Sequence, residues 1–416
     1  MIRNGWILIA MISTLSCAED WPGWRGPRGD GTSAETNVPT VWDGSSGRNI
    51  QWKTPIPGSG HSSPIVSGDA VFLTACDETN QQRLLHCLDR HSGSIRWTRT
   101  VVEAPLEGMH KLNSYASGTP CADGTNVFVT FFRTEDTSQK HGEPGVMVVA
   151  SYDYDGNQKW LVSAGAFSSN HGFCTSPVLY QDFVLVNGDH DGDSYVAALS
   201  KETGEVVWRT PREHRTRSYV TPLLREIDGK MQAVMTGSKR VAGFDPGTGK
   251  RLWWIEGPTE QFVASMVFDN KYFYLSAGFP THHVMAIRPG GENDVTDSHV
   301  AWHVNDAKCY VPSPVVVGDL LFVADDRGIG HCFDTSTGQH VWRERLGRHF
   351  SASLVTANDL VYFTADDGVT TVVQADRNAK VVQTNELGEW VYASPAISDG
   401  KIYMRGTDHL FCIANE

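Results

Sequence analysis

The chain has 416 residues, with 40 glycines, 13 tryptophans and a formal net charge of −13 at pH 7. So acidic a chain is a poor partner for nucleic acid or for an anionic membrane surface, because both rely on basic patches. Abundant glycine and tryptophan suit many tight turns and aromatic packing between sheets, and they argue against a helical protein.

Residues 1–18 are predicted to be a secretory signal peptide. One arginine precedes an apolar run from Trp6 to Ile12, and small residues follow it. Ser16-Cys17-Ala18 fits a cleavage site, which would leave Glu19 as the first mature residue. Lipid attachment at Cys17 is the alternative, although the residues before it match a lipoprotein box poorly. No later apolar run is long enough to cross a bilayer, so we expect an exported protein of the periplasm or cell envelope without a transmembrane segment.

Residues 19–48 are predicted to form an irregular segment, rich in Gly, Trp and Arg, that packs against the rest of the protein. From residue 49 to residue 416 the chain repeats itself. A turn glycine is followed four residues later by tryptophan at five places: Gly93/Trp97, Gly156/Trp160, Gly204/Trp208, Gly249/Trp253 and Gly338/Trp342. Trp52 and Trp302 occupy the same position with altered turns.

Each tryptophan is followed by a short opening motif that begins with Ser or Thr. The eight openers begin at Ser63, Thr119, Ser176, Thr221, Ser265, Ser313, Ser353 and Ser394. They lie between 40 and 57 residues apart. Self-similar units of this length, each made of short strands separated by turns, indicate a propeller.

The two ends of the repeat region are incomplete in complementary ways. Asn49 to Lys53 reads as a fourth strand without the first three, and the last unit, from Tyr392, has only three strands. Pairing them would complete one sheet and leave no open sheet edge. We therefore expect an all-β, single-domain, monomeric propeller of eight four-stranded antiparallel blades, with blades at 61–97, 117–160, 175–208, 220–253, 264–302, 311–342 and 352–384 and an eighth shared between the two ends.

Seven cysteines remain after the predicted signal peptide, and no two are adjacent. Cys87, Cys332 and Cys412 occupy one equivalent place in their repeats, where other repeats carry Ser, Ala or Gly. We interpret them as small core residues rather than as disulfide partners. The pattern assigns no role to the remaining four: Cys76, Cys121, Cys174 and Cys309.

The regular form of the unit ending is a small residue, then Asp, a turn with Ser/Thr-Gly, and a final Trp, as in LDRHSGSIRW and FDPGTGKRLWW. This ending resembles the tryptophan-docking repeat of pyrroloquinoline-quinone-like eight-bladed propellers. That superfamily includes quinoprotein alcohol dehydrogenases and the propeller lipoprotein of the outer-membrane barrel-assembly machinery. The segments WPGWRG and GSGHSSP are also similar to a group of exported propellers from planctomycete-type bacteria. The resemblance implies the fold, but a fold alone does not assign chemistry.

The loops before the first strands of the blades should form one mouth of the central channel. They carry the candidate ligand-binding residues His61, Tyr115, His171, Arg217, Tyr219, Tyr310, His349, Trp390 and Tyr392. Aromatic faces with a few polar groups are typical of a binding site. The alternative is that large side chains merely fill the channel.

A quinone cofactor is the most specific hypothesis that the resemblance raises. Pyrroloquinoline quinone (PQQ) needs a stacking ring, cationic partners for its carboxylates and a Ca²⁺ held by oxygen ligands. Trp390 could stack, and Arg217 or His349 could meet the carboxylates. The resemblance also implies an adjacent cysteine pair, calcium ligands and a catalytic Asp, none of which the mouth loops supply. We therefore keep PQQ and calcium only as an alternative.

Two further groups have metal-like spacing. Asp189, Asp191 and Asp193 could converge on Ca²⁺, although Asp and Gly are also expected in a polar hairpin turn. His282-His283 and the pair His299/His303 flank a long hairpin and could bind a transition metal, but surface histidines are the simpler interpretation. We expect no metal site.

The function we expect is that of an exported, non-catalytic propeller, a binding or scaffolding module that presents its mouth loops or blade rims to an envelope protein or a small ligand. A PQQ-dependent oxidoreductase is the alternative. A third possibility is glycan binding through Tyr115, Tyr219, Tyr310 and Trp390, which no motif supports.

Overall fold

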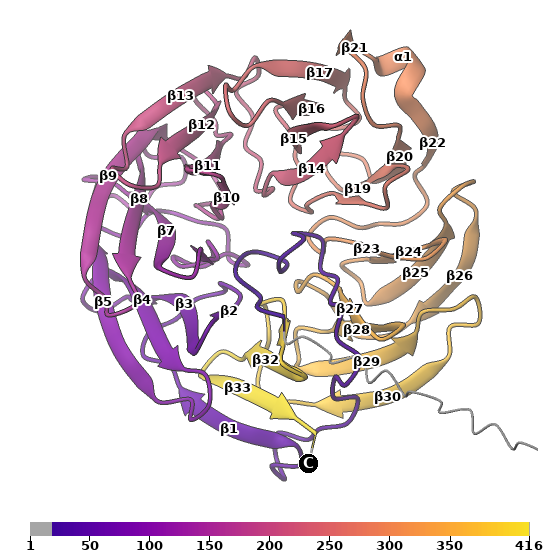
Figure 1. Ribbon diagram of the computed structural model, residues 1–416, viewed down its shortest axis with the longest axis horizontal. Helices are drawn as coiled ribbons and strands as arrows, with labels where there is room; N and C mark the ends of the chain where they lie inside the picture. Colours follow the sequence, from indigo (N-terminus) through magenta and orange to yellow (C-terminus); the bar gives the residue numbers. More distant parts are fainter. Residues whose placement is uncertain (1–18, 416) are drawn as a thin grey trace, which may run out of the picture.

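The computed structural model describes residues 19–415, in which eight sheets surround a central axis (Figure 1). Every sheet contains four antiparallel strands in order from the axis outward, and one of them carries a fifth strand. The only helix in residues 19–415 is one turn, α1 (Thr296–His299). The all-β, eight-bladed fold predicted from the repeats is confirmed.

The blades follow one another along the chain. Blade one comprises β2 (Ile65–Ser67), β3 (Ala70–Asp77), β4 (Gln82–Asp89) and β5 (Ile95–Glu103). Blade two comprises β6 (Cys121–Ala122), β7 (Asn126–Arg133), β8 (Gly145–Asp153) and β9 (Gln158–Phe167). Blade three comprises β10 (Val178–Tyr180), β11 (Phe183–Gly188), β12 (Tyr195–Ser200) and β13 (Val206–Pro211). Blade four comprises β14 (Leu223–Ile227), β15 (Lys230–Gly237), β16 (Arg240–Phe244), β17 (Arg251–Glu256) and the added β21 (Asn293–Asp294).

The second half is built in the same way. Blade five comprises β18 (Val267–Phe268), β19 (Phe273–Ala277), β20 (His283–Ile287) and β22 (Val300–Val304). Blade six comprises β23 (Val315–Val317), β24 (Leu320–Ala324), β25 (Ile329–Asp334) and β26 (His340–Arg345). Blade seven comprises β27 (Val355–Ala357), β28 (Leu360–Thr364), β29 (Val369–Gln374) and β30 (Val381–Glu386). Blade eight comprises β31 (Ala396–Ser398), β32 (Lys401–Arg405), β33 (His409–Ala414) and β1 (Ile50–Pro55).

Burial along the strands explains their composition. All five residues of β24 are buried, because a middle strand has a neighbouring blade on each face and so reads as a continuous apolar run. In the outer strand β26 only Trp342 is buried. The core is therefore a series of contacts between blades rather than one central cluster.

Strand β1 joins the two ends of the described chain. It pairs antiparallel with β33, so that Trp52 lies opposite Cys412. The last sheet thus combines one strand from the beginning of the repeat region with three from its end.

The tryptophans connect each blade to the next. Trp52, Trp97, Trp160, Trp208, Trp302 and Trp342 each donate the indole N–H to a backbone carbonyl in the turn before the fourth strand of the following blade, at 2.8–3.2 Å. The turn glycine lies under the ring: a Cβ on Gly338, whose φ is 72°, would be 2.6 Å from the ring of Trp302. Glycine is thus required there twice, for its positive φ and for the space.

Trp253 departs from this pattern, contrary to the sequence-based expectation. It donates to Oε1 of Gln232 in its own blade, at 2.8 Å. The next blade has the long hairpin 288–299 in place of the glycine turn, and from this hairpin β21 pairs with the outer edge of β17. The hairpin therefore covers blade four instead of receiving its tryptophan.

The small-residue position in the third strand lies directly opposite the tryptophan. Cys87 pairs with Trp97, Cys332 with Trp342 and Cys412 with Trp52 across the sheet. The seven cysteines of residues 19–415 are all free thiols, and these three are fully buried. Burial raises the pKa of each of the three thiols to about 12. They pack as small apolar side chains.

A belt of hydrogen bonds runs around the channel through the opener residues. In seven of the eight steps around the ring, the backbone N–H of one opener donates to the side-chain hydroxyl of the next, at 2.9–3.1 Å. The step from Ser176 to Thr221 makes no such bond within residues 19–415. The Ser/Thr pattern of the openers therefore has a structural cause, since seven of the eight hydroxyls satisfy a backbone donor of the adjacent blade.

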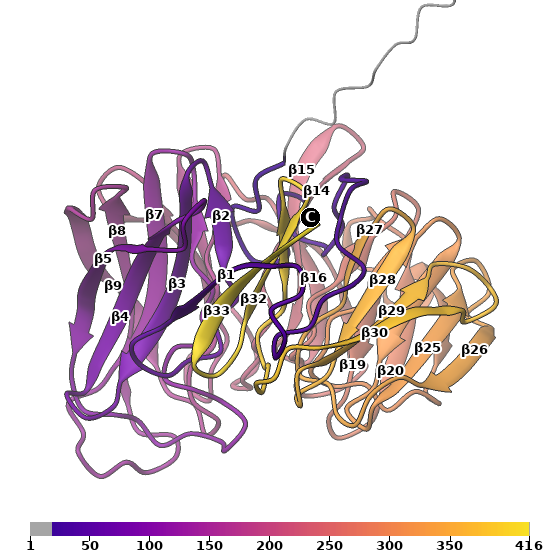
Figure 2. The same ribbon diagram turned by 90° about the horizontal axis from the view of Figure 1, so that it is seen from below.

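The amino-terminal segment crosses one end of the channel (Figures 1 and 2). Trp21 exchanges two backbone hydrogen bonds with Val66, in the first strand of blade one. Farther along the segment, the buried Arg25 donates to the carbonyl of Ser313, and Asp30 pairs with Arg225. The segment also meets Gly68 and Ser398, where the first strands of blades one and eight end. Only the side chain of Arg25 reaches back along the channel, to Ser313 just before β23. The segment therefore covers the mouth opposite to the one formed by the loops before those strands.

Candidate functional site

A cavity of about 560 Å³ lies on the propeller axis, open toward the loops that precede the first strands. This volume falls within the range of pockets that enclose small ligands. Its base is formed by Trp24 of the amino-terminal segment, whose indole N–H donates to the hydroxyl of Ser265 at 3.3 Å. With one mouth covered by this segment, the channel is a cup rather than an open tube.

Seven of the nine candidate residues line this cavity: His61, His171, Arg217, Tyr219, Tyr310, His349 and Tyr392. The other two, Tyr115 and Trp390, do not line it. Tyr115 lies behind the wall, where its ring packs 5.9 Å from the guanidinium carbon of Arg83. Trp390 lies outside the cavity with 55% of its surface exposed and stacks on Tyr392.

The cavity also contains residues that the sequence analysis missed. Trp24 reaches it from a segment far away in sequence, and His110, Phe279 and Asp326 come from loops with no regular pattern. The sequence offers only the adjacent pair Asp325-Asp326 as a signal for this loop, and aspartates are equally expected in a turn. Asp326 also holds the mouth loop, because one carboxylate oxygen accepts from the backbone N–H groups of Tyr310 and Val311, each at 3.2 Å.

The rings of the cavity wall are arranged in two series. In the first ring series (Trp390, Tyr392 and His61), Trp390 and Tyr392 stack at 6.4 Å and 20°, and His61 follows at 4.5 Å and 35° from Tyr392. In the second ring series (His110, His171 and Tyr219), the steps are 5.5 Å at 60° and 6.3 Å at 19°. The first series begins at the exposed rim and continues into the cup.

The cavity carries little net charge. Arg217 pairs with Asp191, and His349 bonds to Asp366 at 2.7 Å. Burial lowers the pKa of His61 to about 4, and burial together with nearby Arg217 lowers the pKa of His171. Desolvation raises the pKa of Asp326. His61 and His171 are therefore neutral at pH 7.

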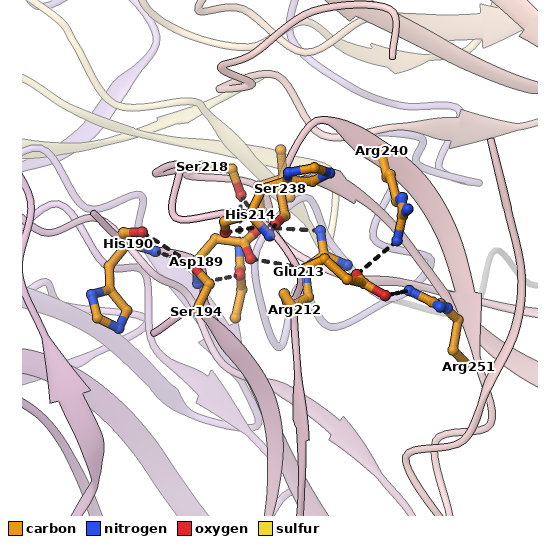
Figure 3. A network of polar contacts seen from close by, with 12 residues as sticks. Asp189, His190, Ser194, Arg212, Glu213, His214, Ser218, Ser238, Arg240 and Arg251 are labelled. Atoms are coloured by element: carbon orange, nitrogen blue, oxygen red, sulfur yellow. Dashed lines mark hydrogen bonds and ion pairs between the residues drawn. The ribbon is translucent and has the colours of Figure 1, made fainter. Parts of the chain in front are cut away.

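The three aspartates with calcium-like spacing do not converge. Asp189 is buried and bonds to Arg212 through both carboxylate oxygens, at 2.8 and 3.1 Å, while Ser218 donates to it at 2.7 Å (Figure 3). Asp191 pairs with Arg217, and Asp193 with Arg215. Each carboxylate thus has its own arginine, which excludes the calcium arrangement considered for this hairpin.

The histidines beside the long hairpin also separate. His283 and His303 bond to each other at 2.7 Å, whereas His299 bonds to Ser298. Between Glu19 and Asn415 no group of three or more His, Cys, Asp or Glu side chains is placed to hold a metal ion.

Closed blades, tryptophans that dock on the next blade and an axial cup define an eight-bladed propeller of the PQQ-like class. A family model described as outer membrane protein assembly factor BamB matches residues 32–131, 81–338, 291–383 and 337–415. The chain therefore belongs to this family.

Curated relatives carry the same description. The protein from Burkholderia pseudomallei strain K96243 is 30% identical over 116 residues, which are 27% of this chain and 30% of that protein. The protein from Yersinia pestis is 21% identical over 364 residues, covering 83% of this chain and 82% of that one. The first match thus spans less than a third of the relative's length.

Solved structures show the same fold. BamB from Moraxella catarrhalis matches with a TM-score of 0.60 and 12% identity, over 88% of this chain and 99% of that one. A europium-containing methanol dehydrogenase matches with a TM-score of 0.59 and 14% identity, over 94% of this chain and 90% of that one. At these identities the likeness concerns the fold alone.

No helix formed by residues 19–415 has the length and apolar character needed to span a membrane.

Proposed function

We propose that the protein is an exported, non-catalytic binding module of the cell envelope, whose open mouth docks a protein partner involved in outer-membrane protein assembly. One observation carries the proposal: three large apolar side chains stand exposed around one mouth. Leu112, Phe279 and Trp390, here called the mouth rim, are 44%, 50% and 55% exposed. Apolar groups gathered around a concavity mark interaction surfaces.

The setting of the mouth rim suits a docking surface. Its residues come from loops of different blades, and those loops are held by the closed ring below them. A preformed surface loses little conformational entropy on association. Aromatic and apolar anchors surrounded by polar groups are also typical of the residues that dominate binding energy. The printed description of the relatives, an assembly factor of the outer membrane, supports a partner of this kind.

Export completes the proposal. The predicted signal peptide, residues 1–18, and the alternative lipid attachment at Cys17 lie outside the described residues. Whichever operates, the protein would reach the periplasmic side of the envelope, where relatives described as outer membrane assembly factors would act. The acidic body gives no basis for binding nucleic acid.

The alternative, a PQQ-dependent oxidoreductase, does not fit the residues present. PQQ carries three carboxylates, and a site for it must supply several cations or hydrogen-bond donors. Among residues 19–415, Arg217 is the only Arg or Lys side chain on the cavity wall, and Asp191 already neutralises it. Arg405, the nearby buried cation, is not part of the wall and donates to Ser62 and to the Thr74 carbonyl instead. The cup therefore offers no match for a tricarboxylate.

Site-specific photocrosslinking in the native cells tests the proposal. A benzophenone amino acid at Phe279 should form an adduct with a component of the outer-membrane assembly machinery, identified by mass spectrometry. The same probe at Val207, an exposed apolar residue of the outer strand β13, is the matched control and should give no such adduct. Adducts of equal yield at both positions, or none at Phe279, would refute the docking role.

A further inference from the structure

The wall of the cup combines aromatic rings with polar groups, and it adjoins the mouth rim at Leu112 and Phe279. Rings of both series line one cavity, and the first series continues from the exposed Trp390, outside the cavity, through Tyr392 to His61 on its wall. His171 and Tyr219 present a second, nearly parallel pair of faces from the loops before blades three and four. A ligand built of several linked rings could contact several of these faces at once.

Polar atoms that have no partner among residues 19–415 lie among the rings. Gln261 accepts from the hydroxyl of Tyr310 at 3.2 Å through Oε1, which leaves its amide N–H groups free. Asp326 uses only one carboxylate oxygen, and His349 uses only Nδ1. All three side chains line the cavity. A purely apolar ligand would cover these atoms and leave them unsatisfied, which is unfavourable.

Charge excludes the other large ligand classes. The wall has one guanidinium, already paired with Asp191, so polyanions find no free cation. A polycation finds no cluster of free carboxylates either, because Asp366 is bonded to His349 and Asp326 stands alone. The remaining class is a neutral molecule that combines flat apolar faces with many hydroxyl groups.

We propose that the cup binds the end of a neutral oligosaccharide. A sugar ring has a face of C–H bonds that stacks on an aromatic ring, and hydroxyl groups at its edge that both donate and accept hydrogen bonds. The ring series supply the faces, and Gln261, Asp326 and His349 supply the edge partners. The covered far mouth means that a chain enters only by its end.

Isothermal titration of the full-length mature protein tests this inference. The probes are neutral hexasaccharides (maltohexaose, cellohexaose and chitohexaose), with oligogalacturonate and PQQ as anionic comparisons. Saturable binding of at least one neutral probe is expected, with none for the anionic ones. Absence of binding by every neutral probe at about 10 mM, or preferential binding of an anionic one, would overturn the proposal.

Two substitutions at Tyr392 separate ring stacking from simple apolar contact. Tyr392→Phe keeps the aromatic face and should retain affinity within about threefold, whereas Tyr392→Leu should lower it at least about tenfold. Equal affinities for the two variants, with unchanged circular dichroism and melting temperature, would contradict stacking. The crosslinking at Phe279 is a separate readout, so either proposal can fail without the other.

Discussion

The backbone N–H of Ser394 donates to the hydroxyl of Ser63 across 3.1 Å, and 331 residues separate the two positions in the chain. This bond links the last opener to the first and joins the hydrogen-bonded belt across the ends of the repeat region. Because both residues are buried, neither group has water as an alternative partner. The belt therefore contributes to closure in addition to the pairing of β1 with β33.

The belt predicts different effects for two chemically identical substitutions. Thr119→Val removes the acceptor of the Ser63 N–H, which lies 3.0 Å away, and leaves that buried donor unpaired. The free energy of unfolding should fall by about 1–3 kcal/mol. Thr221→Val removes a hydroxyl that accepts no such bond, so it should change stability by less than about 0.5 kcal/mol. Urea denaturation of both variants measures the difference, and equal losses would show that the belt bonds contribute nothing.

The tryptophan contact between blades six and seven gives a second prediction. Trp342 is buried and donates to the carbonyl of Asp376 at 3.2 Å. Trp342→Ala should cost about 3–5 kcal/mol, because it opens a cavity between the blades. Trp342→Phe keeps most of the ring and loses the hydrogen bond, so its cost should be clearly smaller. Thermal denaturation ranks the variants, and an alanine variant as stable as the phenylalanine one would rule out a packing role.

The blade-three hairpin predicts independence from calcium and dependence on one arginine. Millimolar Ca²⁺ or a chelator should leave the melting temperature unchanged, because each of the three aspartates has an arginine partner. Arg212→Ala leaves the buried Asp189 charge unpaired and should cost about 3–5 kcal/mol. Arg215→Ala breaks a fully solvated pair and is the matched control, with almost no effect. A melting temperature that rises with Ca²⁺ would disprove this assignment.

Buried neutral histidines predict loss of stability in acid. His86 is buried, with Nδ1 2.8 Å from the hydroxyl of Thr98 and Nε2 2.9 Å from the carbonyl of Pro57. Burial lowers its pKa from 6.5 to about 4. Between these values the unfolded chain binds more protons than the folded one, so this contribution is complete above pH 6.5 and is lost as the pH falls toward 4.

The size of this effect is up to roughly 3 kcal/mol for His86, from the pKa difference between the two states. The difference between the unfolding free energies at pH 7 and pH 4.5 should therefore be smaller for His86→Gln than for the parent protein. His91→Gln, at an exposed position, is the control and should keep the parent pH dependence. A His86→Gln variant with the full parent dependence would place the acid sensitivity elsewhere.

The fold could be predicted from the sequence because its determinants are local and repeated. Gly338 and Trp342 are four residues apart, and their spacing alone indicates the turn and the outer strand. Trp253 shows the limit of this reasoning: its partner depends on what the following blade offers, and the long hairpin of blade five offers no glycine turn. The sequence pattern of one blade does not show whether the following blade has the glycine turn that receives the tryptophan.

The cavity was harder to predict, because loops have no periodicity that sets the direction of a side chain. Tyr115 and Tyr219 both come from mouth loops, yet only Tyr219 faces the cup. Trp24 meets Ser265 across 241 residues, a contact that depends on closure of the whole ring. Chemical type thus identified seven residues of the wall, and only the assembled fold could show its base.

The covered mouth also determines how the protein can be oriented. Glu19 lies on the covered side, where its carbonyl accepts from Ser398. The described part of the chain therefore begins on the side opposite to the open cup. If the amino end were tethered to a membrane, the open cup would look away from that surface, and its ligands would approach from the opposite direction.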